Sequence, residues 1–331
     1  MGKAKDMKHW TKIAVLAICA MLAIALVGCQ QEKPAAEPSD TEAMKSEATD
    51  KQTSTDGDPF YVLIVGNDSR IGTVEINKEN YADGTGRSDT MMLARIDPST
   101  YQVTLVTVPR DTAVDLNGTK TKINEVYRVG GIEESVKEVE KLTGVSIKYY
   151  LDTGFVEFEN FINALGGIVA NVPIDMSLKD IVSGESISLG AGSQDLNGAE
   201  SLVLARVRKL YANDQDACRQ IQDRQIVDVA IRQVAADPAN VAAALAALAE
   251  HTTTNWPSDN LRETVTRFAE HASEINIVSG TGPYAGDFDD SAGGLWLVPR
   301  DEDTWHRAME VVDAGGDPTT VISLPAIVPE G

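Results

Sequence analysis

The chain has 331 residues and a formal net charge of −21, and 43% of its residues are hydrophobic. This length fits one large domain or two ordinary ones, and the hydrophobic content is enough for a full core. Nucleic acid and bare anionic lipid are bound chiefly through neutralisation of their own charge, so the acidic balance argues against both as partners.

The N-terminus has the features of an export signal. Lysines precede an uninterrupted apolar run at 13–27, which is shorter than the roughly twenty residues of a membrane-spanning helix and suits a signal peptide. The run is followed by Gly28 and Cys29, an ending that resembles a bacterial lipobox, in which the cysteine thiol accepts a lipid. We predict a lipoprotein-type signal peptide at 1–28 and lipidation of Cys29. The alternative is an uncleaved signal anchor with an incidental cysteine.

Residues 29–59 are predicted to form a disordered acidic tether. They are rich in Glu, Asp, Ser, Thr, Ala and Pro, and they have too little apolar surface to offset the entropy of ordering. A lipid on Cys29 would hold the folded part at the outer face of the cell membrane. Cys218 would be the only other cysteine of the mature chain, which excludes an internal disulfide.

From Phe60 onward, strands and helices are predicted to alternate. Apolar runs of strand length predict strands at 61–65, 91–96, 103–108, 147–151 and 168–172, with shorter ones at 275–279 and 295–298. Helical spacing predicts helices at 131–142, 155–165, 197–205, 219–235, 241–250, 257–272 and 301–312. The pattern predicts an α/β fold: a single domain at 60–313, with a mixed β-sheet flanked by helices on both faces, and then a flexible tail at 314–331.

Arginines gather beside fixed acids, which is unexpected in so acidic a chain. The strings are Gly86-Arg87-Ser88-Asp89-Thr90, Pro109-Arg110-Asp111, Ala205-Arg206-Val207-Arg208, Asp216-Ala217-Cys218-Arg219 and Asp223-Arg224-Gln225. A guanidinium group offers planar, bidentate donors that match phosphate oxygens. We therefore predict a site for a polyanion such as a pyrophosphate.

Structural salt bridges are the competing explanation for these arginines. For Arg110 beside Asp111, that explanation is the stronger one on spacing alone. It is weaker for Arg206 and Arg208, because neither has an acid within four residues. Two residues apart, this pair would point the same way from an extended segment but not from a helix.

Two aspartates are candidates for holding a divalent cation. Asp68 follows the first predicted strand and Asp89 precedes the second, so one ion at the sheet end would bridge them. Mg²⁺ prefers oxygen ligands and typically takes one or two carboxylates together with phosphate and water. The alternatives are a turn or cap role for Asp68 and an ion pair with Arg87 for Asp89.

Taken in order, the motifs resemble the LytR-CpsA-Psr (LCP) family of cell-wall glycopolymer ligases, from about Tyr61 to Val312. The strings that carry the resemblance are Gly66-Asn67-Asp68-Ser69-Arg70, Gly86 to Met91, Val108 to Thr112, Lys122-Ile123-Asn124 with Tyr127 and Gly130-Gly131, Ala164 to Gly167, Leu196-Asn197-Gly198, Ala205 to Arg208, and Asp216 to Gln225. Two stretches are longer than is usual in the family, one around 71–81 and one between Arg219 and Arg224.

The resemblance implies an extracytoplasmic phosphotransferase. It would move the phosphate of a glycopolymer, such as teichoic acid or capsular polysaccharide, from an undecaprenyl-pyrophosphate carrier to a peptidoglycan hydroxyl, with Mg²⁺ or Mn²⁺ as cofactor. The implied pyrophosphate-binding residues are Arg87, Arg110, Arg206, Arg208, Arg219, Arg224 and Gln225. The implied metal ligands are Asp68 and Asp89, and the implied catalytic residues are Asp89, Arg110 and Asp111.

Several roles stay open at this point. Asp89 and Asp111 are both candidates for the general base that takes the acceptor's proton. A capping or surface role competes evenly with ligand contact for Arg224 and Gln225. The apolar runs 155–165 and 226–234 are candidates for lining a slot for the polyprenyl tail, although such faces are more often plain core.

Three other functions compete with the transferase. A polyprenyl-pyrophosphate pyrophosphatase would use water in place of the sugar hydroxyl at the same site. A non-enzymatic envelope regulator fits poorly with the export signal and with a sequence that has no DNA-reading motif. A plain wall-binding lipoprotein would have no use for metal-type aspartates beside arginines.

Overall fold

The computed structural model describes residues 57–76 and 86–330. The chain divides into two compact units, Met1–Gln52 and Thr53–Gly331, and every described residue belongs to the second. The predicted signal peptide at 1–28, the predicted lipidation site Cys29 and most of the predicted tether at 29–59 lie outside the described residues. Among the helices of residues 57–76 and 86–330, none has the length and apolarity required to span a bilayer.

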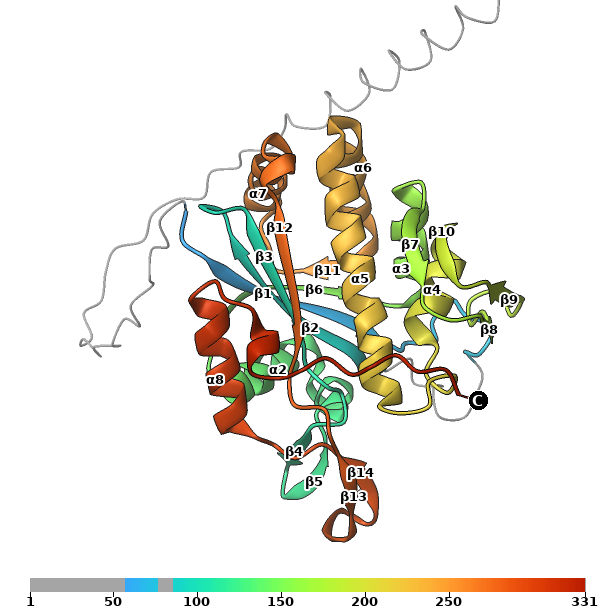
Figure 1. The fold of residues 1–331 in the computed structure, drawn as a ribbon, viewed down its shortest axis with the longest axis vertical. Helices are drawn as coiled ribbons and strands as arrows, with labels where there is room; N and C mark the ends of the chain where they lie inside the picture. Colours follow the sequence, from blue (N-terminus) through green and yellow to red (C-terminus); the bar gives the residue numbers. More distant parts are fainter. Residues whose placement is uncertain (1–56, 77–85, 331) are drawn as a thin grey trace, which may run out of the picture. The chain divides into compact units, whose positions relative to one another are not determined.

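A six-stranded mixed sheet forms the centre of the described part (Figure 1). Its strands lie in the order β11-β6-β1-β2-β3-β12. Their bounds are β1 Phe60–Asn67, β2 Ser88–Asp97, β3 Gln102–Thr107, β6 Ile147–Thr153, β11 Thr253–Thr254 and β12 Asn276–Thr281. β1 pairs antiparallel with β2 and parallel with β6, while β12 pairs parallel with β3. The mixed sheet predicted from the sequence is confirmed.

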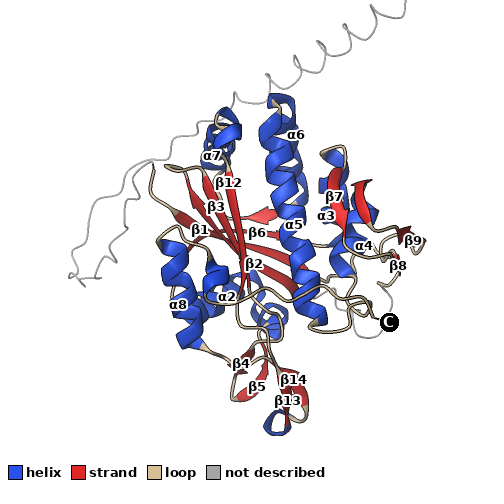
Figure 2. Cartoon of the chain, viewed as in Figure 1, coloured by secondary structure: helices blue, strands red, loops and turns tan. Residues whose placement is uncertain are grey.

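Helices cover both faces of this sheet (Figure 2). Leu63 and Val65 of β1 point to a first face, where the core includes residues of α2 (Asn124–Thr143) and α8 (Glu302–Asp313). Val62 points to a second face, where α5 (Gln215–Ala236), α6 (Pro238–His251) and α7 (Ser258–Glu270) pack. Burial on both faces explains why the strands have continuous apolar runs rather than alternating ones.

A smaller region adds a third core beside the sheet. Its helices are α3 (Phe155–Ala164) and α4 (Gly198–Arg206), and its strands are β7 (Ile168–Val172) and β10 (Gly192–Leu196), which pair antiparallel. The hairpin of β8 (Met176–Lys179) and β9 (Ser186–Leu189) lies next to α4. A capping box between Asn197 and Glu200 fixes the start of α4. Because α4 is short, its fixed start also fixes the position of Arg206, which is its last residue.

The structure adds elements that the sequence pattern did not predict. Besides β8 to β11, these are the hairpin of β4 (Ala113–Leu116) and β5 (Thr119–Lys122) and the strand β13 (Asp287–Asp289), which pairs with β14 (Leu295–Leu297). Such strands are short and largely polar, so they lack an apolar run. Helix α2 begins seven residues before the predicted start at 131. It has a kink at Gly131, whose φ of 70° and ψ of −163° are not helical, so the predicted helix corresponds to the segment after the kink.

The segment predicted to be a flexible tail has contacts along its length. Pro318 to Thr320 forms a short 3₁₀ helix. The Ala212 amide donates to the carbonyl oxygen of Val328, and the Glu330 amide donates to that of Leu210. Ile327 packs against the third core. These attachments are mainly hydrogen bonds of the main chain, which leave no side-chain pattern in the sequence.

Candidate functional site

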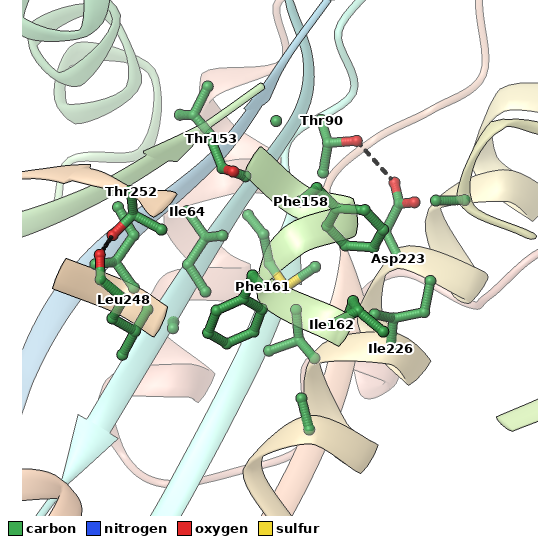
Figure 3. Close-up of a pocket in the computed structure, with 18 of the residues that line it drawn as sticks. Ile64, Thr90, Thr153, Phe158, Phe161, Ile162, Asp223, Ile226, Leu248 and Thr252 are labelled. Atoms are coloured by element: carbon green, nitrogen blue, oxygen red, sulfur yellow. Dashed lines mark hydrogen bonds between the residues drawn. The ribbon is translucent and has the colours of Figure 1, made fainter. Parts of the chain in front are cut away.

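A cavity of about 440 Å³ lies between the second face of the sheet and the helices above it (Figure 3). Its walls come from the sheet and from α3, α5, α6 and α7, and both apolar runs proposed for a lipid slot, 155–165 and 226–234, contribute residues. Figure 3 shows Ile64, Phe161 and Leu248 directed into this space from a strand and two helices. This volume is within the range of about 300–1,000 Å³ found for ligand pockets.

The charged groups of the cavity gather at one end. Five arginines and two aspartates line it: Arg70, Arg110, Arg206, Arg208, Arg219, Asp89 and Asp223. The strand register places this end where β1 and β6 finish and β2 starts, because Gly66 lies opposite both Thr90 and Thr153. Val62, four residues earlier on β1, lines the apolar part roughly 13 Å away at 3.3 Å per residue. The cavity therefore has a cationic rim and an apolar interior.

Arg219 is the buried centre of the rim. Its Nη1 donates to Asp223 Oδ2 at 2.6 Å and to Thr90 Oγ1 at 3.0 Å, and its Nη2 donates to the main-chain oxygen of Asp89 at 2.8 Å. Its Nε lies 3.2 Å from Asp216 Oδ1. Burial raises the pKa of the Asp223 carboxyl to about 6, although Arg219 opposes this shift. The rim thus includes an acid whose pKa lies above the ordinary value of a carboxyl group.

Arg110 links two acids at the same rim. Its Nη1 donates to Asp89 Oδ1 at 2.9 Å, and its Nε lies 3.0 Å from Asp216 Oδ1. The side-chain amide of Asn124 also donates to Asp89 Oδ1, at 3.3 Å. Burial opposes ionisation of Asp216, yet Arg219 and Arg110 hold its pKa below the ordinary value. The acids that pair with Arg110 are therefore not its sequence neighbour Asp111.

Arg206 and Arg208 both reach the cavity, as an extended segment allows. Arg206 ends α4, and Val207 is extended with φ −66° and ψ 129°. Arg208 Nη1 lies 3.7 Å from Asp216 Oδ1. The Arg206 guanidinium instead donates to the main-chain oxygen of Lys179 at 3.4 Å. Within residues 57–76 and 86–330, it has no carboxylate at ion-pair distance.

One aromatic ring supports two of the rim arginines. The guanidinium groups of Arg70 and Arg206 lie 5.0 and 5.2 Å from the centroid of the Phe155 ring. An arginine within about 6 Å of an aromatic face is attracted to it. Burial, and then the nearby charge of Arg70, lower the pKa of Arg206. The rim therefore holds two like charges close together, which an anion would relieve.

The family follows from comparison of the whole sequence with known families. The sequence model of the LytR_cpsA_psr family matches residues 25–302. The chain belongs to the LytR_cpsA_psr family. This confirms the resemblance that the motifs predicted.

Known relatives carry transferase names. The chain is 36% identical over 158 residues to the polyisoprenyl-teichoic acid–peptidoglycan teichoic acid transferase TagV of Bacillus subtilis, covering 46% of this chain and 38% of TagV. It is 33% identical over 186 residues to TagU of the same organism, another transferase of this name, covering 55% of each protein. The matched part thus spans about half or less of these relatives.

The fold agrees with a solved member of the family. The crystal structure of B. subtilis TagV superposes with a TM-score of 0.63 at 25% sequence identity, over 82% of this chain and 100% of that one. A mixed sheet with helices on both faces is therefore the fold of this LytR_cpsA_psr protein.

Besides Asp68, four predicted site residues are not among the described residues that line the cavity. Arg87 forms an ion pair with Glu125, and Asp111 Oδ1 lies 2.7 Å from the Lys122 ammonium group. The other two are Arg224, which contacts β3 of the central sheet, and Gln225, which contacts β7 of the smaller region. Arg224 Nη1 donates to Thr107 Oγ1 at 2.6 Å, and the Gln225 side chain bonds the main chain of Asn171.

The register of α5 explains the last two of these residues. The helix is continuous from Gln215 to Ala236. Residues four apart share one face of a helix, so Asp223 lies on the cavity side with Arg219. Arg224, one position further on, is turned away by about 100°. Asp223, rather than Arg224, therefore lies at this position of the rim.

Of the two predicted metal ligands, Asp89 lines the cavity and Asp68 is not among its described lining residues, although the charge of Asp89 acts on Asp68. Asp68 Oδ1 accepts from the Arg87 amide at 2.6 Å, and Asp68 Oδ2 lies 3.7 Å from Arg70 Nη2. Burial raises the pKa of Asp68, and the nearby charge of Asp89 raises it further. Among the residues that the structure describes, no group of three or more His, Cys, Asp or Glu is arranged to hold a metal. Two carboxylates fit a Mg²⁺ that takes its other ligands from phosphate and water.

Three residues of the rim had no role in the sequence analysis. Asp223 and Arg70 stand inside strings that were noted for their neighbours, and Phe155 belongs to a run considered only for its apolar surface. For Asp223 a signal was present, because an acid four residues after Arg219 on a helix predicts an ion pair. No local signal exists for Phe155, since its two arginine partners come from distant segments.

Proposed function

We propose that this protein is a phosphotransferase that moves a glycopolymer phosphate from an undecaprenyl-pyrophosphate carrier to a peptidoglycan hydroxyl. The observation that carries the proposal is the cavity, which has five arginines at one end and an apolar wall along the rest. A ligand with a pyrophosphate head and a long hydrocarbon tail matches both parts. The names of TagV and TagU, which are teichoic acid transferases, support the same substrate class.

The rim residues have separate parts in this chemistry. Arg206 and Arg208 would bind the pyrophosphate, and Arg110 and Arg219 would neutralise the charge that spreads over the phosphate oxygens during transfer. The acceptor hydroxyl would form a bond to the glycan-linked phosphorus while the bond between the two phosphates breaks. The lipid would leave with one phosphate, and the hydroxyl proton would pass to a carboxylate.

Asp89 is the better placed of the two candidate bases. It lines the cavity and its side chain is 32% exposed, with Arg110 and Asn124 bound at Oδ1. Asp111 is not among the described lining residues and forms an ion pair with Lys122. We therefore assign proton acceptance to Asp89.

A divalent cation, Mg²⁺ or Mn²⁺, belongs to the proposal. Asp68 and Asp89 would hold it, and when bound it would neutralise charge on the phosphates. Asp89→Asn should lose transfer without a fall in melting temperature. Full transfer by a thoroughly metal-stripped protein would contradict a metal requirement.

We also propose that the protein is lipid-anchored at Cys29 on the outer face of the cell membrane, where its carrier and acceptor meet. The support is the apolar run that ends at Gly28-Cys29. Cys29→Ala should abolish incorporation of a fatty-acid probe into the protein. An intact N-terminus at Met1 in the mature protein would exclude this anchor.

Product analysis tests the transferase directly. The full chain is incubated with Mg²⁺ and a polyprenyl-pyrophosphate-linked glycopolymer, with and without purified peptidoglycan. The proposal expects polymer joined to peptidoglycan through a phosphate, together with polyprenyl phosphate, only when the acceptor is present. Equal release of polyprenyl phosphate without peptidoglycan would mean that the protein is a pyrophosphatase.

A further inference from the structure

Two aromatic rings face solvent on the hairpin of β13 and β14. Phe288 is 70% exposed, more than any other large hydrophobic side chain among the described residues, and Trp296 is 41% exposed. The two residues lie opposite one another in the strand register, and their ring centroids are 5.4 Å apart at an interplanar angle of 82°. Exposed apolar surface of this kind is costly unless something covers it, and it often marks a binding site.

The hairpin holds these rings in a fixed position. Its other face packs inward: Leu297 is buried, and Asp289 forms an ion pair with Lys120 of β5. At the tip, Asp289 also accepts from the amides of Ser291 and Ala292. Gly286 lets the indole lie against the backbone, because a Cβ there would come within 2.9 Å of Trp296 Nε1. The rings are therefore parts of a built surface rather than the tip of a loose loop.

The same hairpin is joined to the loop that carries Arg110 to the cavity rim. The Val298 amide donates to the main-chain oxygen of Asp111 at 2.9 Å, and the Ala113 amide donates to that of Val298 at 2.8 Å. Trp296 is two residues before Val298, which is roughly 7 Å along an extended chain. Figure 1 shows β13 and β14 beside β4 and β5, the elements that follow this loop. The chain that follows the two rings is thus hydrogen-bonded to the loop that carries Arg110.

The chemistry of the surface selects among ligands. Sugar rings have an apolar face that packs on an aromatic ring, and their hydroxyl groups donate hydrogen bonds to carboxylates. Asp287 and Asp290, which are neighbours in sequence of this hairpin's Phe288, are exposed carboxylates. Their charge disfavours an anionic membrane surface or an anionic polymer. An uncharged sugar chain fits all of these features.

We propose that Phe288 and Trp296 form a binding surface for the sugar chain of the acceptor peptidoglycan. This inference rests on the proposed function, because it places the acceptor strand beside the loop that carries Arg110. The two rings bind the strand outside the cavity, so they add affinity for the acceptor and none for the lipid-linked donor.

Co-sedimentation with purified peptidoglycan, stripped of its attached polymers, tests the surface without any transfer step. The full-length double variant Phe288→Ser with Trp296→Ser should bind peptidoglycan about ten-fold more weakly than the parent. Each aromatic ring contributes to the binding free energy, and a small loss of binding free energy is enough for a ten-fold loss of affinity. Trp296→Phe, which keeps a ring, should bind nearly as the parent does. Val169→Ser removes a side chain that is 55% exposed on β7 and serves as the matched surface control.

The outcomes separate the surface from its rivals. Unchanged peptidoglycan binding in the double variant, or an equal loss in Val169→Ser, overturns the proposal. Loss of binding to phosphatidylglycerol vesicles with peptidoglycan binding intact assigns the rings to the membrane instead. A dimer that becomes a monomer in the double variant assigns them to self-association. Because the assay contains no donor, failure of the transfer assay tests the proposed function separately.

Discussion

The two faces of the central sheet have similar strands but differ in what the helices leave between them. On the first face, α8 contributes Trp305, whose side chain is fully buried in the core. On the second face, α6 is rich in alanine, and Ala244 and Leu248 of this helix line the cavity. Small side chains leave volume where a large one would fill it. The covering helices, rather than the strands, therefore determine which face of the sheet has room for a ligand.

Trp305→Ala should have the largest effect on stability. A buried Trp or Phe truncated to Ala typically costs about 3–5 kcal/mol, because the transfer free energy is lost and a cavity remains. Chemical denaturation should show this loss for Trp305→Ala. Phe161→Ala, on the wall of the existing cavity, should cost clearly less. Equal losses would mean that the two faces are packed alike.

Arg206→Ala should have the largest effect on binding with little effect on stability. Hydrogen bonds to charged groups contribute about 1.5–3 kcal/mol, so the affinity for a polyprenyl pyrophosphate should fall about ten-fold or more. The melting temperature should stay near that of the parent, because no described carboxylate pairs with Arg206. Titration by calorimetry measures the affinity.

The control for Arg206 is Arg262→Ala, which removes an exposed arginine paired with Asp259 on α7. It should leave the affinity unchanged. A large fall in melting temperature with unchanged affinity for Arg206→Ala would make this arginine a structural residue.

Substitution of alanine by phenylalanine should have opposite results on the two faces. Ala244→Phe places a ring in the cavity, so binding of a long polyprenyl pyrophosphate should weaken while the protein remains stable. Ala308→Phe on α8 introduces a ring into the filled core, where overpacking typically costs about 1–3 kcal/mol. Melting curves and binding of a long and a short prenyl pyrophosphate measure both effects. Similar destabilisation by the two variants would contradict the comparison.

The smallest expected effect is a change in how stability depends on pH. The pKa of Asp223 is raised to about 6 in the folded protein, so the folded state binds a proton that the unfolded state releases near pH 4. Ionisation of Asp223 therefore lowers stability as pH rises from about 4 to 6. Asp223→Asn should lose less stability than the parent over this interval, as urea unfolding at several pH values would measure. If the stabilities of the two proteins changed with pH in parallel, ionisation of Asp223 would not be the cause of the pH dependence.

Much of this architecture was predictable because its signals are local. The strand 61–65 and the helix 219–235 follow from apolar runs and spacing, and Arg206, Arg208 and Arg219 stand out as clustered arginines in an acidic chain. In the hairpin of β13 and β14, the first strand has no such run, because two of its three residues are aspartates. Arg224 and Gln225 do not line the cavity, and their spacing in sequence does not fix which face of α5 they occupy.

The cavity itself was beyond sequence reasoning for a different reason. Its volume depends on which side chains from the sheet strands and from helices α3 to α7 fail to meet, and no single window of the sequence contains that information. Phe155 likewise belongs to the rim because its ring lies against Arg70 and Arg206, which are 85 and 51 positions away in the sequence. The sequence identified the apolar runs as candidates, and only their packing decided between a plain core and a slot.

A crystal structure of the protein with a polyprenyl pyrophosphate bound would test the proposed binding site directly. Pyrophosphate oxygens should lie within hydrogen-bond distance of Arg206 and Arg208, and the hydrocarbon tail should lie between the second face of the sheet and α6, against Ile64 and Leu248. A tail bound elsewhere, or phosphates held away from these arginines, would contradict the proposed site.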